Sequence, residues 1–109
     1  AIKIGDLLFL SGQISISPET NEFIDGDIEI QTEQVLKNIK AILEAGSSSL
    51  EDVVKVSIYL QDIKDFALVN NIYSKYFKDS LPARVCIEVS NLPKNAKVEI
   101  DAIGIKNNN

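Results

Sequence analysis

Five short segments are predicted to be β-strands, and in most of them apolar residues recur with a period of two. The segments are residues 2–4, 7–13, 53–60, 83–89 and 97–105. Gly5-Asp6 is a turn dipeptide, so the first two strands are predicted to form a tight antiparallel hairpin. A turn around Pro93 leads into the fifth strand, and we expect a second antiparallel hairpin at that end. In the third strand one face is predicted to carry Val54, Val56, Ile58 and Leu60.

Two longer segments carry apolar residues at spacings of three and four, which is typical of amphipathic α-helices. The first stripe is Val35, Leu36, Ile39, Ile42 and Leu43, and the second is Phe66, Val69, Asn70, Tyr73, Tyr76 and Phe77. Thr32 or the upstream Asp27 is expected to cap the first helix, and Gly46 is expected to end it in a left-handed conformation. Asp62 or Asp65 is expected to open the second helix.

The resulting order, β-β-α-β-α-β-β, predicts an α+β sandwich with two helices on one face of a mixed sheet. A helix joins the third and fourth strands, so these two are predicted to be parallel with a right-handed crossover. The 109 residues show no internal repeat, and we expect one domain over residues 1–106 followed by a disordered tail, 107–109.

One strand predicts that the chain associates with itself. Leu7-Leu8-Phe9-Leu10 is apolar at every position, as in a strand that is buried on both faces. Two helices can cover only one face of a sheet of this size. We therefore expect a second copy of the chain to cover the other face, and the alternative is a half-exposed apolar strand.

The composition excludes several classes of chemistry. With no histidine and a single cysteine, the chain can form no serine–histidine or cysteine–histidine nucleophile system, no internal disulfide and no CxxC zinc site. The glycines are scattered singly and form no phosphate-binding loop. The net charge of −5 opposes binding to a nucleic-acid backbone. No apolar run approaches the length of a membrane span and no leader is visible, so we expect a soluble protein of the cytoplasm or mitochondrion.

Charged residues on the last two strands are candidates for a site. If Val85 and Ile87 face the helices, the opposite face of the fourth strand carries Arg84 and Cys86. Alternation along the fifth strand places Glu99 on that face as well. A guanidinium group binds a carboxylate through two parallel hydrogen bonds, and a nearby carboxylate can act on water as a general base. The alternative is an ordinary cross-strand ion pair.

Three further residues each have two interpretations. Asn70 lies on the apolar stripe of the second helix, where its amide either bonds a neighbouring loop or points into a pocket. Gly12 either marks a bend in its strand or lets a ligand approach the backbone. Cys86 is either an inert residue near the core or a reactive thiol.

Five segments together resemble the RidA (YjgF/YER057c/UK114) family, in register over essentially the whole chain. They are residues 10–14, 66–70, 82–89, 92–94 and 98–102. The most specific part is Pro-Ala-Arg-x-Cys, followed at the right distance by x-Glu-Ile-x-Ala. In the family, a segment ending in Gly-Pro-Tyr-Ser-Gln precedes the point that matches Ala1, and its tyrosine contributes to the pocket.

The resemblance implies a fold like that of the Bacillus-type chorismate mutase. That fold is a homotrimer with its sheets packed into a central barrel, its helices outside and its pockets in the clefts between subunits. The implied activity is hydrolysis of reactive 2-imino acids, such as 2-iminobutanoate and 2-iminopropanoate, to 2-oxo acids and ammonia, with no metal or organic cofactor. Endoribonuclease or translation-inhibitor activity, and binding of small carboxylates without catalysis, are the alternatives that the sequence leaves open.

The resemblance also assigns roles to single residues. Arg84 matches the arginine that binds the substrate carboxylate, and Glu99 matches the glutamate that positions the attacking water. Asn70 and Cys86 match pocket residues, and Gly12 lies in the strand that lines the site.

Overall fold

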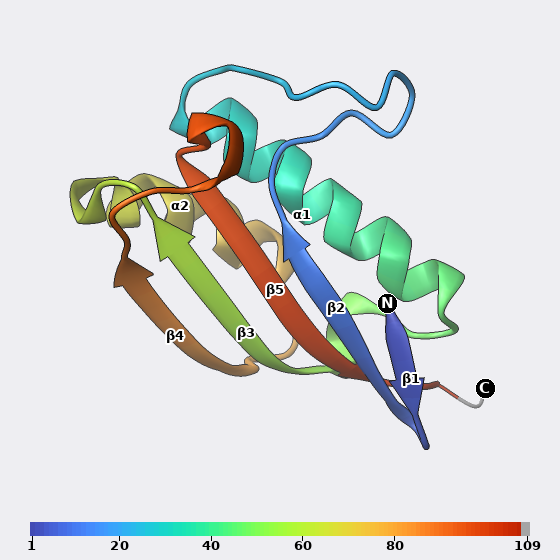
Figure 1. Cartoon of the computed structure of the whole chain (residues 1–109). Helices are drawn as coiled ribbons and strands as arrows, with labels where there is room; N and C mark the ends of the chain where they lie inside the picture. The colour runs from blue at the N-terminus through green and yellow to red at the C-terminus, as the bar shows by residue number, and fades with distance from the viewer. Residues whose placement is uncertain (108–109) are drawn as a thin grey trace.

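Two helices cover one face of a five-stranded sheet in the computed structural model, which describes residues 1–107 (Figure 1). The helices are α1 (Ile28–Ala45) and α2 (Phe66–Tyr76). The strands are β1 (Ile2–Ile4), β2 (Leu7–Gln13), β3 (Val53–Leu60), β4 (Ala83–Glu88) and β5 (Val98–Ile105). The predicted α+β class and the predicted order of elements are both confirmed.

The strands run across the sheet in the order β1-β2-β5-β3-β4. β3 and β4 are parallel, as predicted, and the other neighbouring pairs are antiparallel. The predicted hairpin between the last two strands is wrong, because β5 lies between β2 and β3 and leaves β4 at the edge. The inward side chains of β5, including Val98 and Ile100, are fully buried. A central position for this strand therefore removes more apolar surface from water than an edge position would.

The core lies between the sheet and the helices. Its members from the sheet include Leu8, Leu10, Val56, Ile58, Leu60, Val98, Ile100 and Ala102, and its members from the helices include Val35, Leu36, Ile39, Leu43, Val69, Tyr73 and Phe77. One predicted core residue is wrong: Val54 is 40% exposed, and Val53 takes the buried place instead. The pairing of β3 with β5 shifts register between Val53 and Lys55, and this irregularity reverses the alternation at the start of β3.

Asp27 caps the N-terminus of α1, which confirms one of the two predicted caps. Its carboxylate oxygen Oδ1 accepts a hydrogen bond of 2.9 Å from the backbone N–H of Ile30. Thr32 lies inside the helix and does not cap it. Asp65 directly precedes α2, whereas Asp62 caps the short turn before it.

The prediction that Gly46 ends α1 in a left-handed conformation is wrong. Gly46 has a φ of −92°, and the left-handed residue is Ser47, with a φ of 63°. A Cβ atom at Gly46 would lie 2.6 Å from Cδ2 of Leu8. Glycine therefore suits this position because β2 passes close by, and not because of its backbone angles.

At the C-terminal end of the described residues, the backbone N–H of Asn107 donates to the carbonyl oxygen of Ser47 over 2.7 Å. The other two residues of the predicted disordered tail, 108–109, lie outside the described residues. Among residues 1–107, neither helix is long and apolar enough to cross a membrane.

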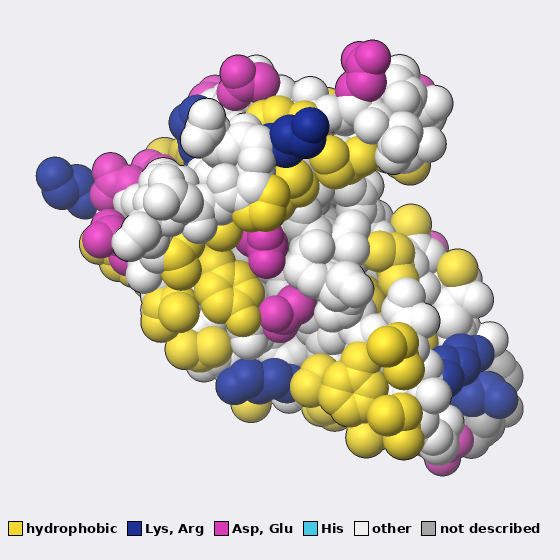
Figure 2. All heavy atoms as spheres, viewed as in Figure 1, with side chains coloured by type: hydrophobic (Ala, Val, Ile, Leu, Met, Phe, Trp, Pro, Cys, Tyr) yellow, Lys and Arg dark blue, Asp and Glu magenta, His cyan; other side chains and the backbone are white. Residues whose placement is uncertain are grey.

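The face of the sheet that carries no helix exposes many apolar side chains. Figure 2 looks onto this face and shows hydrophobic side chains gathered in two areas, with acidic side chains between them. Exposed apolar residues of the sheet and its margins include Ile2, Ile4, Leu7, Val54, Val85, Ile87 and Ile105. Apolar patches of this kind mark surfaces of association. The alternative of a half-exposed β2 also fits the isolated chain, in which Leu7 remains exposed.

The cap of α1 predicts a measurable loss of stability. Replacing Asp27 by alanine leaves the N–H of Ile30 without its acceptor, and we expect the free energy of unfolding to fall by about 1 kcal/mol. Urea denaturation measures this difference. Asp25→Ala, at an exposed position two residues upstream, is the control and should change stability far less. Equal losses in the two variants would contradict the capping role.

Candidate functional site

Arg84 lies on β4 and points toward the helices. The parallel register aligns Arg84 with Val56 and Cys86 with Ile58, and residues aligned across two strands point to the same face of a sheet. Val56 and Ile58 are fully buried beneath the helices. Arg84 and Cys86 therefore share the helix-facing side of the sheet.

The prediction that Val85 and Ile87 face the helices is consequently wrong. These side chains are 40% and 45% exposed on the helix-free face, in register with Ser57 and Tyr59. Glu88, two residues after Cys86 on β4, also lies on the helix side, where its Oε1 accepts a hydrogen bond from the backbone N–H of Ile63. Both faces of this sheet carry apolar residues. Alternation along the edge strand β4 therefore defines two sets of residues but does not show which set faces the helices.

Three residues of α2 hold the guanidinium group of Arg84. Nη1 of Arg84 donates to Oδ1 of Asn70 over 2.6 Å. The guanidinium carbon lies 5.5 Å from the ring centroid of Phe66 and 4.8 Å from that of Tyr73, within the range of cation–π attraction. These residues are spaced by four and three along one stripe of the helix. An exposed, permanently charged group is thus held in place with most of its donors unused.

A cavity of about 260 Å³ lies beside this arginine. Its lining consists of Asn70, Tyr73, Ser74, Phe77, Leu81, Pro82 and Arg84. Asn70 therefore lines a cavity, and the interpretation that it bonds a neighbouring loop is wrong. A concave wall of mixed apolar and polar side chains with one fixed cation suits a small organic anion.

Cys86 follows Arg84 on the same face and is partly buried. Burial raises the pKa of its thiol from 9.0, and the positive charge of Arg84 opposes that rise. The thiol is therefore protonated at neutral pH, which does not favour a nucleophilic role. Cys86 contacts the core, in agreement with the interpretation of a small inert residue.

Glu99 lies on the opposite face of the sheet. It is in register with Tyr59, and the next residue of β5, Ile100, is buried on the helix side. A Cβ atom at Gly12 would lie 2.3 Å from Oε2 of Glu99, so only glycine fits beside this carboxylate without displacing it. The pairing of β2 with β5 also shifts register next to Gly12. The interpretation of Gly12 as a bend fits this register shift, whereas the group that approaches its backbone is the carboxylate of Glu99, and the approach of a ligand stays a prediction.

Two effects raise the pKa of Glu99 above its usual value of 4.5. Burial is the larger one, and the negative charge of Asp101, two residues along the same face, is the second. The carboxylate of Asp101 accepts a hydrogen bond of 3.1 Å from the hydroxyl of Tyr59. A carboxylate with a raised pKa is a stronger base than an ordinary one, which suits it to accept a proton from water.

The predicted site residues thus form two groups on opposite faces of one sheet. Arg84, Asn70 and Cys86 lie on the helix side, and Glu99 and Gly12 lie on the free face. The prediction that Arg84 and Glu99 share a face is wrong. Sequence reasoning also missed the roles of Phe66, Tyr73, Tyr59 and Asp101. The aromatic stripe on either side of Asn70 was the signal for the first two.

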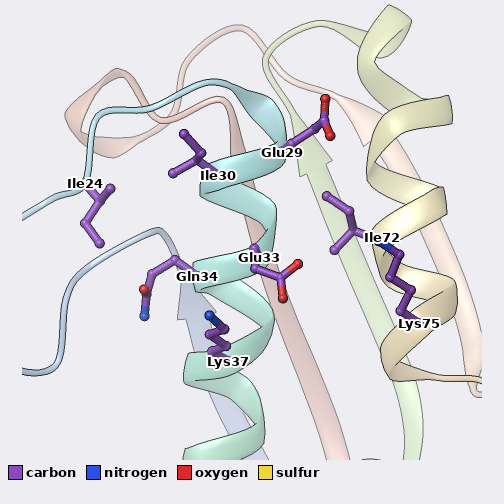
Figure 3. A pocket seen from close by; sticks show the side chains of 8 residues that line it. All are labelled: Ile24, Glu29, Ile30, Glu33, Gln34, Lys37, Ile72 and Lys75. Atoms are coloured by element: carbon purple, nitrogen blue, oxygen red, sulfur yellow. The ribbon is translucent and has the colours of Figure 1, made fainter.

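A second cavity, of about 380 Å³, lies between α1 and α2 (Figure 3). Charged side chains of both signs surround it, including Glu29, Glu33, Lys37 and Lys75. None of the predicted site residues lines it. The hydroxyl of Tyr76 donates to Glu33, which ties the two helices together. This cavity is therefore separate from the site that the sequence indicates.

The raised pKa of Glu99 predicts a pH-dependent effect on stability. Folding favours the protonated form, so wild-type stability should fall as the pH rises from about 4.5 through the higher pKa of the folded state. Glu99→Gln removes the ionising group. We expect a larger free energy of unfolding than wild type at pH 7 and no difference below pH ~4. Denaturation at both pH values measures this, with exposed Glu51→Gln as the control. A loss of stability at pH 7 would contradict the assignment.

Comparison with known proteins supports a relationship over nearly the whole chain. A family model described as Endoribonuclease L-PSP matches residues 1–106. RutC family protein PH0854 of Pyrococcus horikoshii is 58% identical over 106 residues, covering 97% of this chain and 84% of that protein. Reactive Intermediate Deaminase A, chloroplastic, of Arabidopsis thaliana is 50% identical over 103 residues, covering 94% of this chain and 55% of that protein.

The structural comparison agrees. The crystal structure of E. coli TdcF with bound serine superposes with a TM-score of 0.90 at 36% identity, covering 97% of this chain and 85% of that one. Its similarity extends to the helices and to the whole mixed sheet, since nearly all residues of this chain are covered. The chain therefore belongs to the RidA/YjgF/L-PSP family, whose members include a reactive intermediate deaminase.

Proposed function

We propose that this protein hydrolyses reactive 2-imino acids, such as 2-iminobutanoate and 2-iminopropanoate, to 2-oxo acids and ammonia. The observation that carries the proposal is the guanidinium of Arg84, which Asn70 and two aromatic rings hold with most of its donors unused. Such a group binds a carboxylate through two parallel hydrogen bonds. Membership of a family that includes Reactive Intermediate Deaminase A supports the same reaction.

The chemistry requires little beyond positioning. An imine carbon is electrophilic, so a water molecule held in line with it can attack once the carboxylate of the substrate is fixed on Arg84. As the water oxygen bonds to the carbon of the protonated imine, Glu99 accepts one proton from that water, and a neutral tetrahedral carbinolamine forms. Glu99 then returns this proton to the nitrogen, the C–N bond breaks, and the hydroxyl proton passes to the departing ammonia as the carbonyl of the 2-oxo acid forms. The raised pKa of Glu99 favours its acceptance of the proton from water.

A complete site needs two chains, because Arg84 and Glu99 lie on opposite faces of one sheet. We propose a homotrimer in which the helix-free faces pack into a barrel, as in the Bacillus-type chorismate mutase. Arg84 of one chain then meets Glu99 of the next in a cleft between subunits. The exposed apolar residues of the free face support this assembly. The bound serine of TdcF, a small carboxylate, supports the proposed ligand class.

RNA cleavage is the activity that the description of the family model names. The net charge of −5 and the absence of histidine disfavour it, because phosphate binding needs a basic surface. Binding of a small carboxylate without catalysis requires the same cavity beside Arg84, and an assay of imine hydrolysis distinguishes this function from that of an enzyme.

Hydrolysis is measured with an amino-acid oxidase that generates the imine and semicarbazide that traps what remains. Wild type should lower semicarbazone formation. Arg84→Ala should raise KM about tenfold or more because the carboxylate loses its charged partner. Glu99→Gln should lower kcat about a hundredfold or more because the general base is gone.

The matched control is Glu88→Gln, a carboxylate on the other face whose loss should leave kcat near that of wild type. Carboxylate binding with no effect on semicarbazone formation would favour a binding protein over a hydrolase. Equal activity in wild type and Glu99→Gln would contradict the proposed role of Glu99.

A further inference from the structure

The hydroxyl of Tyr73 is buried and has no hydrogen-bond partner, and it is the single such side-chain atom found within residues 1–107. Tyr73 itself is 5% exposed. An unpaired buried hydroxyl lowers stability, and most buried polar atoms in proteins are paired. Phenylalanine occupies two other positions of the same stripe, Phe66 and Phe77, and would fill this space without that cost. The hydroxyl therefore points to a partner that is not part of the chain.

Among the described residues, none of the groups that contact Tyr73 accepts a hydrogen bond from its hydroxyl. The guanidinium carbon of Arg84 lies 4.8 Å from the ring centroid of Tyr73, and a guanidinium can only donate. Oδ1 of Asn70 already accepts from Arg84, and the neighbouring ring of Phe77, 4.6 Å away, offers no polar atom. Two adjacent groups thus have unused donors. The missing partner is an anion with at least two acceptor atoms, which describes a carboxylate.

We propose that Tyr73 is a ligand-binding residue whose O–H donates to the same carboxylate that Arg84 binds. The proposal rests on the proposed function for the identity of the acid, and it adds a second donor to the site. Arg84 donates to both carboxylate oxygens, and the hydroxyl of Tyr73 donates to one of the same two oxygens, each of which can accept two hydrogen bonds. The cavity of about 260 Å³, which both residues line, holds the rest of a small acid.

Contact with the hydroxyl requires Arg84 to shift, because the tyrosine is covered in the ligand-free chain. Arg84 is exposed, and one hydrogen bond and the two ring contacts hold its guanidinium. A carboxylate that draws the guanidinium outward replaces the bond to Asn70 with two stronger, charge-assisted bonds. The hydroxyl of Tyr73 then becomes accessible from the cavity.

The test compares Tyr73→Phe with Tyr76→Phe, using 2-oxobutanoate as the probe in calorimetric titrations of the purified protein. Tyr73→Phe should weaken binding about tenfold while leaving the Tm of the ligand-free protein unchanged or higher. Tyr76→Phe loses the bond to Glu33, outside the cavity. It should lower the Tm and leave the dissociation constant unchanged. The two variants are thus expected to differ in both measurements: binding weakens only in Tyr73→Phe, and the Tm falls only in Tyr76→Phe.

Unchanged binding in Tyr73→Phe would overturn the proposal, and so would a lower Tm of its ligand-free form, which would reveal a structural partner for the hydroxyl. Failure of wild type to bind 2-oxobutanoate would also overturn it. The titration measures binding and not hydrolysis, so a failure of this proposal can be distinguished from a failure of the proposed function. If wild type binds the probe but hydrolyses no imine, the proposed function fails, and the tyrosine comparison still decides the role of Tyr73.

Discussion

The parallel register between β3 and β4 is the constraint on which the site depends. It aligns Arg84 with the buried Val56, and so turns an arginine toward helices that otherwise cover an apolar core. A shift by one residue would reverse every side chain of β4 and place Val85 beneath α2 instead. The amide of Asn70 and the rings of Phe66 and Tyr73 are spaced on α2 to receive the guanidinium and would then have no cation to hold.

The same register leaves β4 at the edge of the sheet with its apolar side chains on the free face. Val85 and Ile87 there join Tyr59 beside the acidic pair of Glu99 and Asp101. A surface that is apolar around two carboxylates is poorly suited to water, and its burial by another copy would desolvate Glu99 further. In such an assembly, contacts that stabilise the oligomer would also strengthen its general base.

The sequence predicted the elements well because their periodicities are local properties of the chain. The stripes of both helices and the cap at Asp27 follow from short-range patterns, and the parallel β3–β4 pair follows from the helix that joins these two strands. The face of the sheet that Arg84 occupies could not be predicted in this way, because alternation defines two sets of residues without showing which set faces the helices. The position of β5 between β2 and β3 depends on long-range pairing. The unpaired hydroxyl of Tyr73 depends on packing, which periodicity does not describe.

If Arg84 and Glu99 act together from different chains, mixing subunits that each lack one of the two residues should restore activity. Arg84→Ala and Glu99→Gln proteins, each expected to keep about a tenth or less of wild-type activity at substrate concentrations below KM, are unfolded together in equal amounts and refolded, and imine hydrolysis is then measured. If each cleft takes one residue from each of two neighbours, random mixing leaves about a quarter of the clefts intact, and about a quarter of wild-type activity returns. If the refolded mixture is no more active than the two variants refolded separately while refolded wild type is active, the two residues do not act across an interface.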